Sequence, residues 1–322
     1  MALGRGSPQR PSRATHHTQL ADPATDLETA KVEYTAGMST PVTVAVMRTI
    51  NKLGGKHGEY AASFVLHHTP HRWVPSTGVY RVRRNGLHWT LDLDDNLQRR
   101  LYLVGAYESL TLAVLFSRLR PDDVFLDVGA NIGAIALPIA QRLRRPGRVI
   151  AVEAAKDTAA RLRKHVAVNN LDDRVRVVEA ALSDREGEAR LRLSDFGPGD
   201  VGTRTLEGDL PTAGDPVRIT TGDILRRQLE GARFDILKVD VEGHERFVLD
   251  GFAETFAECP PRIVVLEILA GHQERSGGSS QLLLDRMSEL GYGGLAIRHR
   301  GLRPVTPEFS GNVIFEMRQP RF

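Results

Sequence analysis

The sequence predicts an α/β fold, doubly wound, in which a mostly parallel sheet carries helices on both faces. From residue 121 onwards, short apolar runs of strand length alternate with segments of helical periodicity. Strands that alternate with helices in this way build parallel sheets. Hydrophobic residues make up 41% of the 322 residues and charged residues 26%, so the chain has enough apolar material for a large core.

Residues 1–40 are predicted to form a disordered N-terminal arm. They are rich in Ser, Thr, Pro, Arg and Ala, and they contain too few apolar residues to offset the entropy of ordering. The adjacent His16 and His17 are interpreted as incidental rather than as metal ligands. The arm has no apolar stretch of the kind that secretory signals carry, and Cys259 is the only cysteine. We therefore expect a cytoplasmic protein without internal disulfides.

Residues 41–100 are expected to form a small accessory segment. The helical spacing of apolar residues predicts one or two helices over 41–75. Alternating apolar and polar residues over 78–93 predict two short strands. Asn85-Gly86 between these strands is a strong hairpin signal, because both residues tolerate a positive φ.

The main α/β domain is expected to span residues 101–322, and a helix over 97–119 leads into it. Five apolar runs are predicted to form parallel strands, and in chain order they read VFLDVG, RVIAVEA, RVRVVEAALSD, FDILKVDVEG and RIVVLEIL. The helices of this domain are predicted over 132–143, 159–168, 245–256 and 282–290. Strand-like segments around a loop at 197–216 form an excursion, and GLAIRH and NVIFEM close the chain as an antiparallel pair.

The sharpest motif is FLDVGANIG at residues 125–133, where a buried strand leads through a tight turn into a helix. Gly129 and Gly133 allow the turn and the close approach of a ligand, and Asn131 tolerates the left-handed region. The spacing G-x-x-x-G lacks the glycine that dinucleotide-binding loops place against a pyrophosphate. With Asp127 just before it, the loop suits a ligand without phosphates, such as S-adenosylmethionine. An ordinary strand–turn–helix connection is the alternative interpretation.

Acidic residues stand at or near the ends of the predicted strands, where open α/β sheets bind their ligands. Glu153 ends the second strand, so we expect it to accept hydrogen bonds from both ribose hydroxyls of the ligand. Asp184, or the backbone near it, is expected to hold an adenine amino group. The five acids that follow this pattern are Asp127, Glu153, Asp184, Asp240 and Glu267.

The motifs of the main domain resemble those of the FkbM family of S-adenosylmethionine-dependent methyltransferases, which have the class I, Rossmann-like fold. The matching pieces are GAYE at 105–108, DVFLDVGANIG at 123–133, GRVIAVEA at 147–154, LDDRVRVVEAALSDREGEA at 171–189, VRITTGD at 217–223, FDILKVDVEGHE at 234–245 and IVVLEI at 263–268. The resemblance implies a seven-stranded sheet with an antiparallel C-terminal strand, and S-adenosyl-L-methionine as the cofactor. Ala154 and Ala155 depart from the Pro and Asn that the family usually places after its second-strand Glu.

The expected acceptor follows from the resemblance and from the charge distribution. Family members with known roles mostly O-methylate sugars or macrocyclic natural products, which favours a hydroxyl on a glycosylated or polyketide-type metabolite. The net charge of +3 resides in residues 1–20, and the rest of the chain has 40 acidic and as many basic residues. A neutral body is not typical of nucleic-acid binders, and the apolar runs are too short to span a membrane. We expect a small-molecule acceptor and neither nucleic acid nor membrane as a partner; the oligomeric state stays open.

Other functions of the same fold remain as alternatives. They are a non-catalytic cofactor-binding protein, a methyltransferase acting on nitrogen or on RNA, and an NAD-linked oxidoreductase. The glycine spacing disfavours the oxidoreductase, because the loop lacks the dinucleotide pattern.

The candidate catalytic residues lie in KVDVEGHE, at the exit of the fourth predicted strand. Methylation of a hydroxyl needs a group that removes its proton, and Asp240, Glu242 and His244 are the candidates for this general base. Asp240 is also expected to contact the cofactor, and Glu108 to pair with the ammonium of its amino acid end. Structural roles are the alternatives, such as helix capping by His244 or an ion pair between Lys238 and Asp240. Carboxylates at strand ends can hold magnesium, but we predict no metal here.

Overall fold

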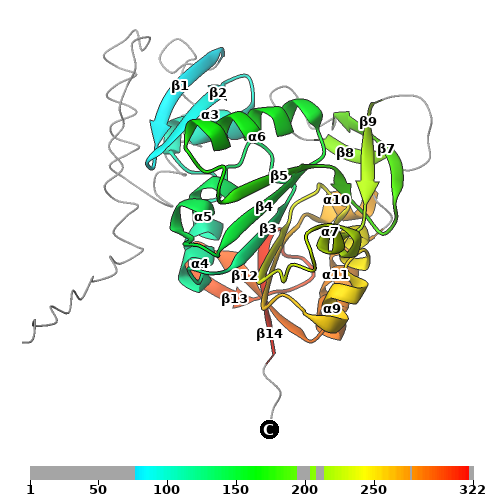
Figure 1. Cartoon of the computed structure of the whole chain (residues 1–322). Helices are drawn as coiled ribbons and strands as arrows, with labels where there is room; N and C mark the ends of the chain where they lie inside the picture. The colour runs from blue at the N-terminus through cyan, green and yellow to red at the C-terminus, as the bar shows by residue number, and fades with distance from the viewer. Residues whose placement is uncertain (1–76, 194–203, 208–213, 276–277, 319–322) are drawn as a thin grey trace, which may run out of the picture.

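The computed structural model describes residues 77–193, 204–207, 214–275 and 278–318 (Figure 1). The predicted disordered arm, the predicted helices over 41–75 and the His16–His17 pair lie outside the described residues. Within the described ranges, no helix is both long enough and apolar enough to cross a membrane.

An eight-stranded, mostly parallel sheet forms the centre of the domain. From one edge to the other its strands are β13 (Gly301–Pro304), β12 (Tyr292–Arg298), β14 (Gly311–Met317), β11 (Ile263–Ile268), β10 (Ile236–Val239), β3 (Val124–Val128), β4 (Arg148–Glu153) and β5 (Val175–Glu179). Strands β5, β4, β3, β10 and β11 are parallel, whereas β14 runs antiparallel to both β11 and β12. The predicted α/β fold with an antiparallel C-terminal strand is confirmed. β13 adds an eighth strand at the edge, which the sequence did not predict because GLRP is short, largely exposed and contains a proline.

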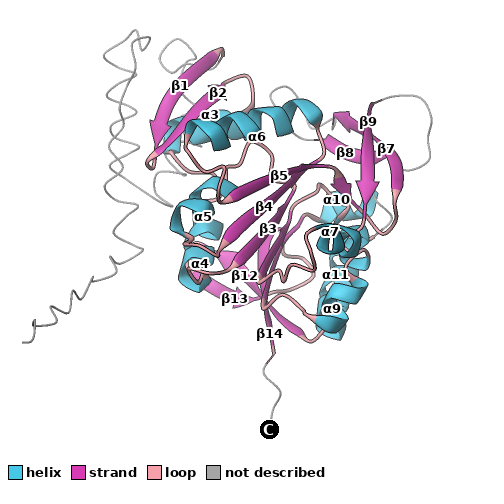
Figure 2. Cartoon of the chain, in the orientation of Figure 1, coloured by secondary structure: helices cyan, strands magenta, loops and turns pink. Residues whose placement is uncertain are grey.

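Helices cover both faces of the sheet, as Figure 2 shows for α4 and α5 on one side and α7, α9 and α11 on the other. The helices are α3 (Asn96–Val104), α4 (Ser109–Arg118), α5 (Ala136–Arg142), α6 (Lys156–Val168), α7 (Gly222–Gln228), α8 (Glu245–Asp250), α9 (Ala253–Glu258), α10 (Ala270–Arg275) and α11 (Ser280–Glu289). Two hydrophobic cores result: Phe125 of β3 packs in one with Leu137 of α5, and Leu126 of β3 packs in the other with Leu249 of α8. Because neighbouring strand residues face opposite cores, the central strands are mostly apolar, with Asp127 in β3 and Lys238 in β10 as exceptions.

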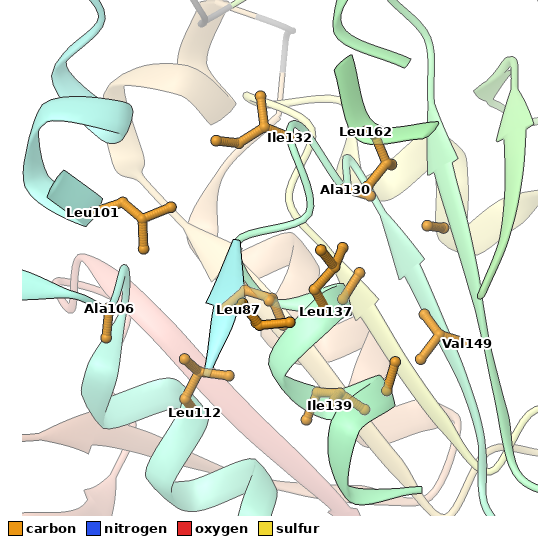
Figure 3. Close-up of a cluster of buried hydrophobic side chains, with 14 of the residues drawn as sticks. Leu87, Leu101, Ala106, Leu112, Ala130, Ile132, Leu137, Ile139, Val149 and Leu162 are labelled. Atoms are coloured by element: carbon orange, nitrogen blue, oxygen red, sulfur yellow. The ribbon is translucent and has the colours of Figure 1, made fainter. Parts of the chain in front are cut away.

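The accessory hairpin docks on the first of these cores. β1 (Val79–Arg84) and β2 (Leu87–Asp92) pair antiparallel, and Asn85 and Gly86 between them both have positive φ, so the predicted hairpin is confirmed. Leu87 of β2 lies among the buried side chains in Figure 3. Trp89, which is 3% exposed, packs edge-on against the ring of His165 in α6, with 5.1 Å between ring centroids. The hairpin therefore contributes buried side chains to the first hydrophobic core.

Three predicted helices have different bounds in the structure, two because of the local backbone conformation and one because of a contact with another segment. The helix over 97–119 is two helices, because Gly105 ends α3 in the left-handed region and Glu108, also left-handed, precedes α4. The helix over 132–143 begins only at Ala136, after the glycine loop. The helix over 245–256 divides into α8 and α9 next to Gly251, where an added Cβ atom would lie 2.0 Å from a backbone oxygen of another segment.

The strand-like segments around the predicted loop at 197–216 belong to a small second sheet. Its strands are β6 (Ala181–Leu182), β9 (Asp215–Thr220), β7 (Gly187–Leu193) and β8 (Arg204–Glu207), in that order across the sheet. The third predicted strand thus divides, with β5 in the large sheet and β6 in the small one. α7 follows β9 directly, because the Thr221 side chain accepts a hydrogen bond from the backbone N–H of Ile224 and caps that helix.

Candidate functional site

A cavity of about 390 Å³ lies at the carboxyl ends of β3, β4, β10 and β11. This is the edge of the sheet where open α/β folds bind their ligands. The sequence-predicted site residues that line it are Asp127, Gly129, Asn131, Glu153, Asp240 and Glu242. The structure therefore brings most of the predicted site residues to one cavity.

The glycine loop between β3 and α5 packs its backbone directly on the loop after β10. Gly129 has a φ of 83°, and a Cβ atom at this position would lie 1.8 Å from the backbone oxygen of Asp240. A Cβ atom at Gly133 would lie 2.2 Å from Leu137 Cδ1. Asn131 has a φ of 50°, and its side-chain oxygen accepts a hydrogen bond from the next backbone N–H. The backbone contact requires glycine at Gly129, and the positive φ of both Gly129 and Gly133 favours glycine at each.

The Glu153 carboxylate holds the glycine loop and the start of α6 together. Its Oε2 accepts a hydrogen bond from the backbone N–H of Asn131 at 2.9 Å, and its Oε1 accepts one from Ala155 at 2.8 Å. The side chain is half-buried and lines the cavity. Each carboxylate oxygen can accept a further hydrogen bond, so the geometry allows Glu153 to receive donors from the cavity.

A buried cluster of charges forms the floor of the cavity around the middle strands. Asp127 and Lys238 are paired in register on β3 and β10, and both side chains are buried. Lys238 Nζ donates a hydrogen bond to Asp240 Oδ2 at 2.8 Å, which confirms the ion pair that the sequence suggested as a structural alternative. Asp127 is fully buried, and neither of its carboxylate oxygens has a hydrogen-bond partner. Burial raises the pKa of Asp127 to about 7, and the nearby Asp240 and Glu108 carboxylates add to this rise against the opposing charge of Lys238.

Three carboxyl groups come together beside this lysine. Oxygens of Glu108, Asp240 and Glu267 lie within 4.8 Å of one another. Burial, together with the neighbouring carboxylates, raises the pKa of Glu267 well above its usual range. Burial also opposes ionisation of Asp240, but the charge of Lys238 and hydrogen bonds from Lys238 and Glu267 keep its pKa below the ordinary value. Glu267 therefore holds the proton of this pair and donates it in a hydrogen bond to Asp240.

Glu242 and His272 form an acid–imidazole pair on the wall of the cavity. Glu242 has a φ of 55° in the loop after β10, and its Oε2 lies 2.8 Å from Nδ1 of His272 in α10. Both residues line the cavity. His272 was not predicted from the sequence, because α10 is short and polar and because His272 lies some 30 residues after Glu242 in the chain. The signal that could have identified it is its position just beyond the carboxyl end of β11, since the acids at the ends of the other strands were predicted by that rule.

His244 and Asp184 are not among the residues that line the cavity. His244 Nε2 lies 3.0 Å from the hydroxyl of Ser183, and its ring stacks on Phe247. Burial lowers the pKa of His244 to about 4, so its ring is neutral at neutral pH. Asp184 accepts a hydrogen bond from Ser183 and pairs with Arg185 near the surface. Beside the third strand, the cavity is lined instead by Ala180, Ala181 and Leu182.

A second cavity of about 220 Å³ adjoins the first. Arg100, Tyr107 and Glu267 line both cavities. Glu108 lines only the second cavity. Burial and the adjacent carboxylates raise the pKa of Tyr107 well above its usual value, which keeps its hydroxyl protonated.

Known proteins share the sequence pattern of this domain. A sequence model described as the methyltransferase FkbM domain matches residues 127–293. The chain is 28% identical over 164 residues to the hexuronic acid methyltransferase AglP of Haloferax volcanii, and the alignment covers 51% of this chain and 63% of that protein. It is 29% identical over 245 residues to the AMB antimetabolite synthetase AmbE of Pseudomonas aeruginosa, where the alignment covers 63% of this chain and 11% of the relative.

Among solved structures, the methyltransferase FkbM from Methylobacillus flagellatus aligns with a TM-score of 0.42 and 17% identity, over 68% of this chain and 52% of that one. The chain covers less than two thirds of the length of either curated relative. The match to the domain model nevertheless extends over more than half of the chain, from Asp127 in β3 to Gly293 in β12. The chain belongs to the FkbM-domain methyltransferases.

Proposed function

We propose that this methyltransferase uses S-adenosylmethionine to methylate a hydroxyl group of a small molecule, such as a sugar. The observation that carries the proposal is Asp127, a fully buried carboxylate without a hydrogen-bond partner at the floor of the cavity. A buried, unpaired acid is costly unless a ligand supplies the missing positive charge or hydrogen-bond donors. S-adenosylmethionine carries both, because it has a sulfonium, an ammonium group and two ribose hydroxyls.

The residues around Asp127 fit this cofactor. Gly129, Ala130 and Asn131 of the glycine loop line the cavity, so this loop can contact the amino acid end of the cofactor. Glu153 would hold the ribose. Because Asp184 does not reach the cavity, the backbone near Ala181 is the place for the adenine. When bound, the cofactor supplies an electrophilic methyl group.

The chain's own residues supply the acid–base chemistry. His272, oriented by Glu242 at 2.8 Å, is the group on the cavity wall best arranged to take a proton from an acceptor hydroxyl. Asp240 accepts hydrogen bonds from Lys238 and Glu267, which keep its carboxylate ionised. It therefore contributes a fixed negative charge and is not the group that takes the proton. This proposal replaces His244 by His272 as the imidazole base, because His244 does not line the cavity.

A sugar acceptor draws support from a relative as well. The methyltransferase AglP, which is 28% identical to this chain over 164 residues, acts on a hexuronic acid. A sugar-like acceptor is therefore the first class to test. The test is the transfer of label from S-adenosylmethionine carrying a radioactive methyl group to a panel of glycosides and polyketides. Labelled product that depends on the enzyme supports the proposal, and label found only in amine or RNA acceptors would contradict it.

The Glu153→Ala variant is expected to lose cofactor affinity by roughly tenfold to a hundredfold. A carboxylate that accepts hydrogen bonds from hydroxyls contributes about 1.5–3 kcal/mol, and each 1.4 kcal/mol is a factor of ten. Calorimetric titration with S-adenosylmethionine measures the change. Glu179→Ala is the matched control, since Glu179 lies beside Glu153 in the β4–β5 register but does not line the cavity. Equal affinities of the two variants would contradict the ribose assignment.

Cofactor binding is expected to strengthen with rising pH, because of Asp127. Its pKa of about 7 means that the carboxylate is mostly protonated at pH 6 and mostly ionised at pH 8. Only the ionised form attracts the cationic cofactor, so affinity should rise about tenfold between these pH values and level off above them. Titrations of the native chain and of Asp127→Asn across this range measure the effect. A pH dependence that is unchanged in Asp127→Asn would show that another group titrates.

A further inference from the structure

Apart from Glu108, which the sequence predicted to pair with the ammonium group of the cofactor, the second cavity contains none of the residues proposed to hold the cofactor. Of the groups that line it, only Arg100, Tyr107 and Glu267 also face the first cavity. These shared residues make the second cavity a side chamber of the cofactor site, adjacent to the Glu108–Asp240–Glu267 carboxyl cluster. A chamber in this place is available to a second ligand while the first cavity is filled.

We propose that the second cavity is the acceptor subsite and that it takes a polyhydroxylated acid, with hydroxyl groups at Glu108 and Asn312 and a carboxylate at Arg100. The proposal rests on the proposed methyltransferase function and adds to it the groups by which the acceptor is recognised. It concerns binding alone and requires no additional chemical step.

Two acceptor oxygens on the inner wall of this cavity have no hydrogen-bond donor. Glu108 Oε2 and Asn312 Oδ1 are both buried, and neither has a hydrogen-bond partner. Thr111 and Asn312 hydrogen-bond to the Glu108 carboxylate, so its position is fixed although one oxygen stays unpaired. Buried acceptor oxygens are costly when left unpaired, and neighbouring hydroxyl groups of a ligand would satisfy both. The inner wall therefore selects a ligand that presents hydroxyls.

The outer wall carries a cation that is available to a ligand. Lys238 is paired with Asp240, and His272 is paired with Glu242. Arg100, on the exposed side of α3, makes no ion pair with any residue in the described ranges. A guanidinium group binds a carboxylate through two parallel hydrogen bonds. Arg100 is therefore the group at the junction of the cavities that suits an anionic part of the acceptor.

The carboxyl cluster decides between a carboxylate and a phosphate as the anion. Glu108, Asp240 and Glu267 stand close to the junction that Arg100 lines. A phosphate monoester carries about 1.5–2 negative charges at neutral pH, whereas a carboxylate carries one. Repulsion from the ionised members of the cluster is therefore greater for the phosphate, and the single negative charge of a carboxylate is favoured.

The test compares two sugars that differ only in the proposed carboxylate. Methyl β-D-glucopyranosiduronic acid and methyl β-D-glucopyranoside are titrated by calorimetry into the full chain saturated with S-adenosylhomocysteine, with glucose 6-phosphate as a third ligand. The variants are Arg100→Gln, Asn312→Ala and the control Arg144→Gln. Arg144 is an exposed arginine in the loop before β4, and it lines neither cavity.

We expect the sugar acid to bind at least about tenfold more tightly than the neutral sugar, as for a charge-assisted pair of hydrogen bonds. Arg100→Gln should abolish this preference, Arg144→Gln should retain it, and Asn312→Ala should weaken both sugars. S-adenosylhomocysteine affinity should be the same in all of these variants. Equal binding of the two sugars, no binding of either, tightest binding of the phosphate, or a preference that survives Arg100→Gln would overturn the subsite. Failure of S-adenosylhomocysteine to bind the native chain would instead overturn the proposed function, and the subsite with it.

Discussion

Gly129→Ala is expected to destabilise the fold by about 4 kcal/mol or more and to abolish cofactor binding. The added Cβ atom would lie 1.8 Å from the backbone oxygen of Asp240, so the glycine loop and the loop after β10 would have to separate. That separation would displace the loop that is proposed to contact the cofactor. The free energy of unfolding from urea titrations and the calorimetric affinity for S-adenosylmethionine measure both effects.

Gly231→Ala is the matched control for this substitution. Gly231 also has a positive φ, of 73°, but a Cβ atom there meets nothing within 4 Å. Only the cost of placing alanine in the left-handed region remains, about 1–2 kcal/mol. Equal destabilisation by the two substitutions would mean that conformation alone, and not the contact with Asp240, explains the glycine.

Turnover is expected to fall by about 10²–10⁴-fold in His272→Asn, the range by which general-base assistance accelerates proton transfer. Glu242→Gln should lower turnover as well, because it removes the carboxylate that orients the imidazole at 2.8 Å. Cofactor affinity should change less than twofold in both variants. Initial rates of label transfer to the acceptor, together with calorimetry, separate the two effects.

His244→Asn decides between the two histidines in the same assay. His244 lies against Ser183 and Phe247 and does not line the cavity, so turnover of the folded variant should stay near that of the native chain. A large loss in His244→Asn with none in His272→Asn would support the assignment made from sequence and contradict the one made from the structure.

The fold was largely predictable because its signals are local. Alternating strand and helix patterns predicted the parallel sheet, and Asn85-Gly86 predicted the hairpin that the structure confirms. One of the differences in helix bounds comes from a tertiary contact. The turn at Gly251 packs against the backbone of Ser183 in a distant segment, and no helical period in the sequence reports such a contact. β13 and α10 were missed because they are too short to show any period.

The candidate site was predictable where residues stand at or next to the carboxyl end of a strand. Asp127, Glu153 and Asp240 stand there, and all three line the cavity. The pairing of Glu242 with His272 was not predictable, because it depends on how the loops after two neighbouring strands approach each other. The direction of the His244 ring depends on its packing against Phe247, which strand spacing does not encode.

Calorimetric titration of the full chain with S-adenosylmethionine and, separately, with NADH tests the central claim most directly. The glycine loop without a pyrophosphate-binding glycine, the unpaired Asp127 and the half-buried Glu153 together favour the first ligand. We expect S-adenosylmethionine to bind in a ratio of one molecule to one chain and NADH to show no binding. Binding of NADH, or the absence of S-adenosylmethionine binding, would contradict the account.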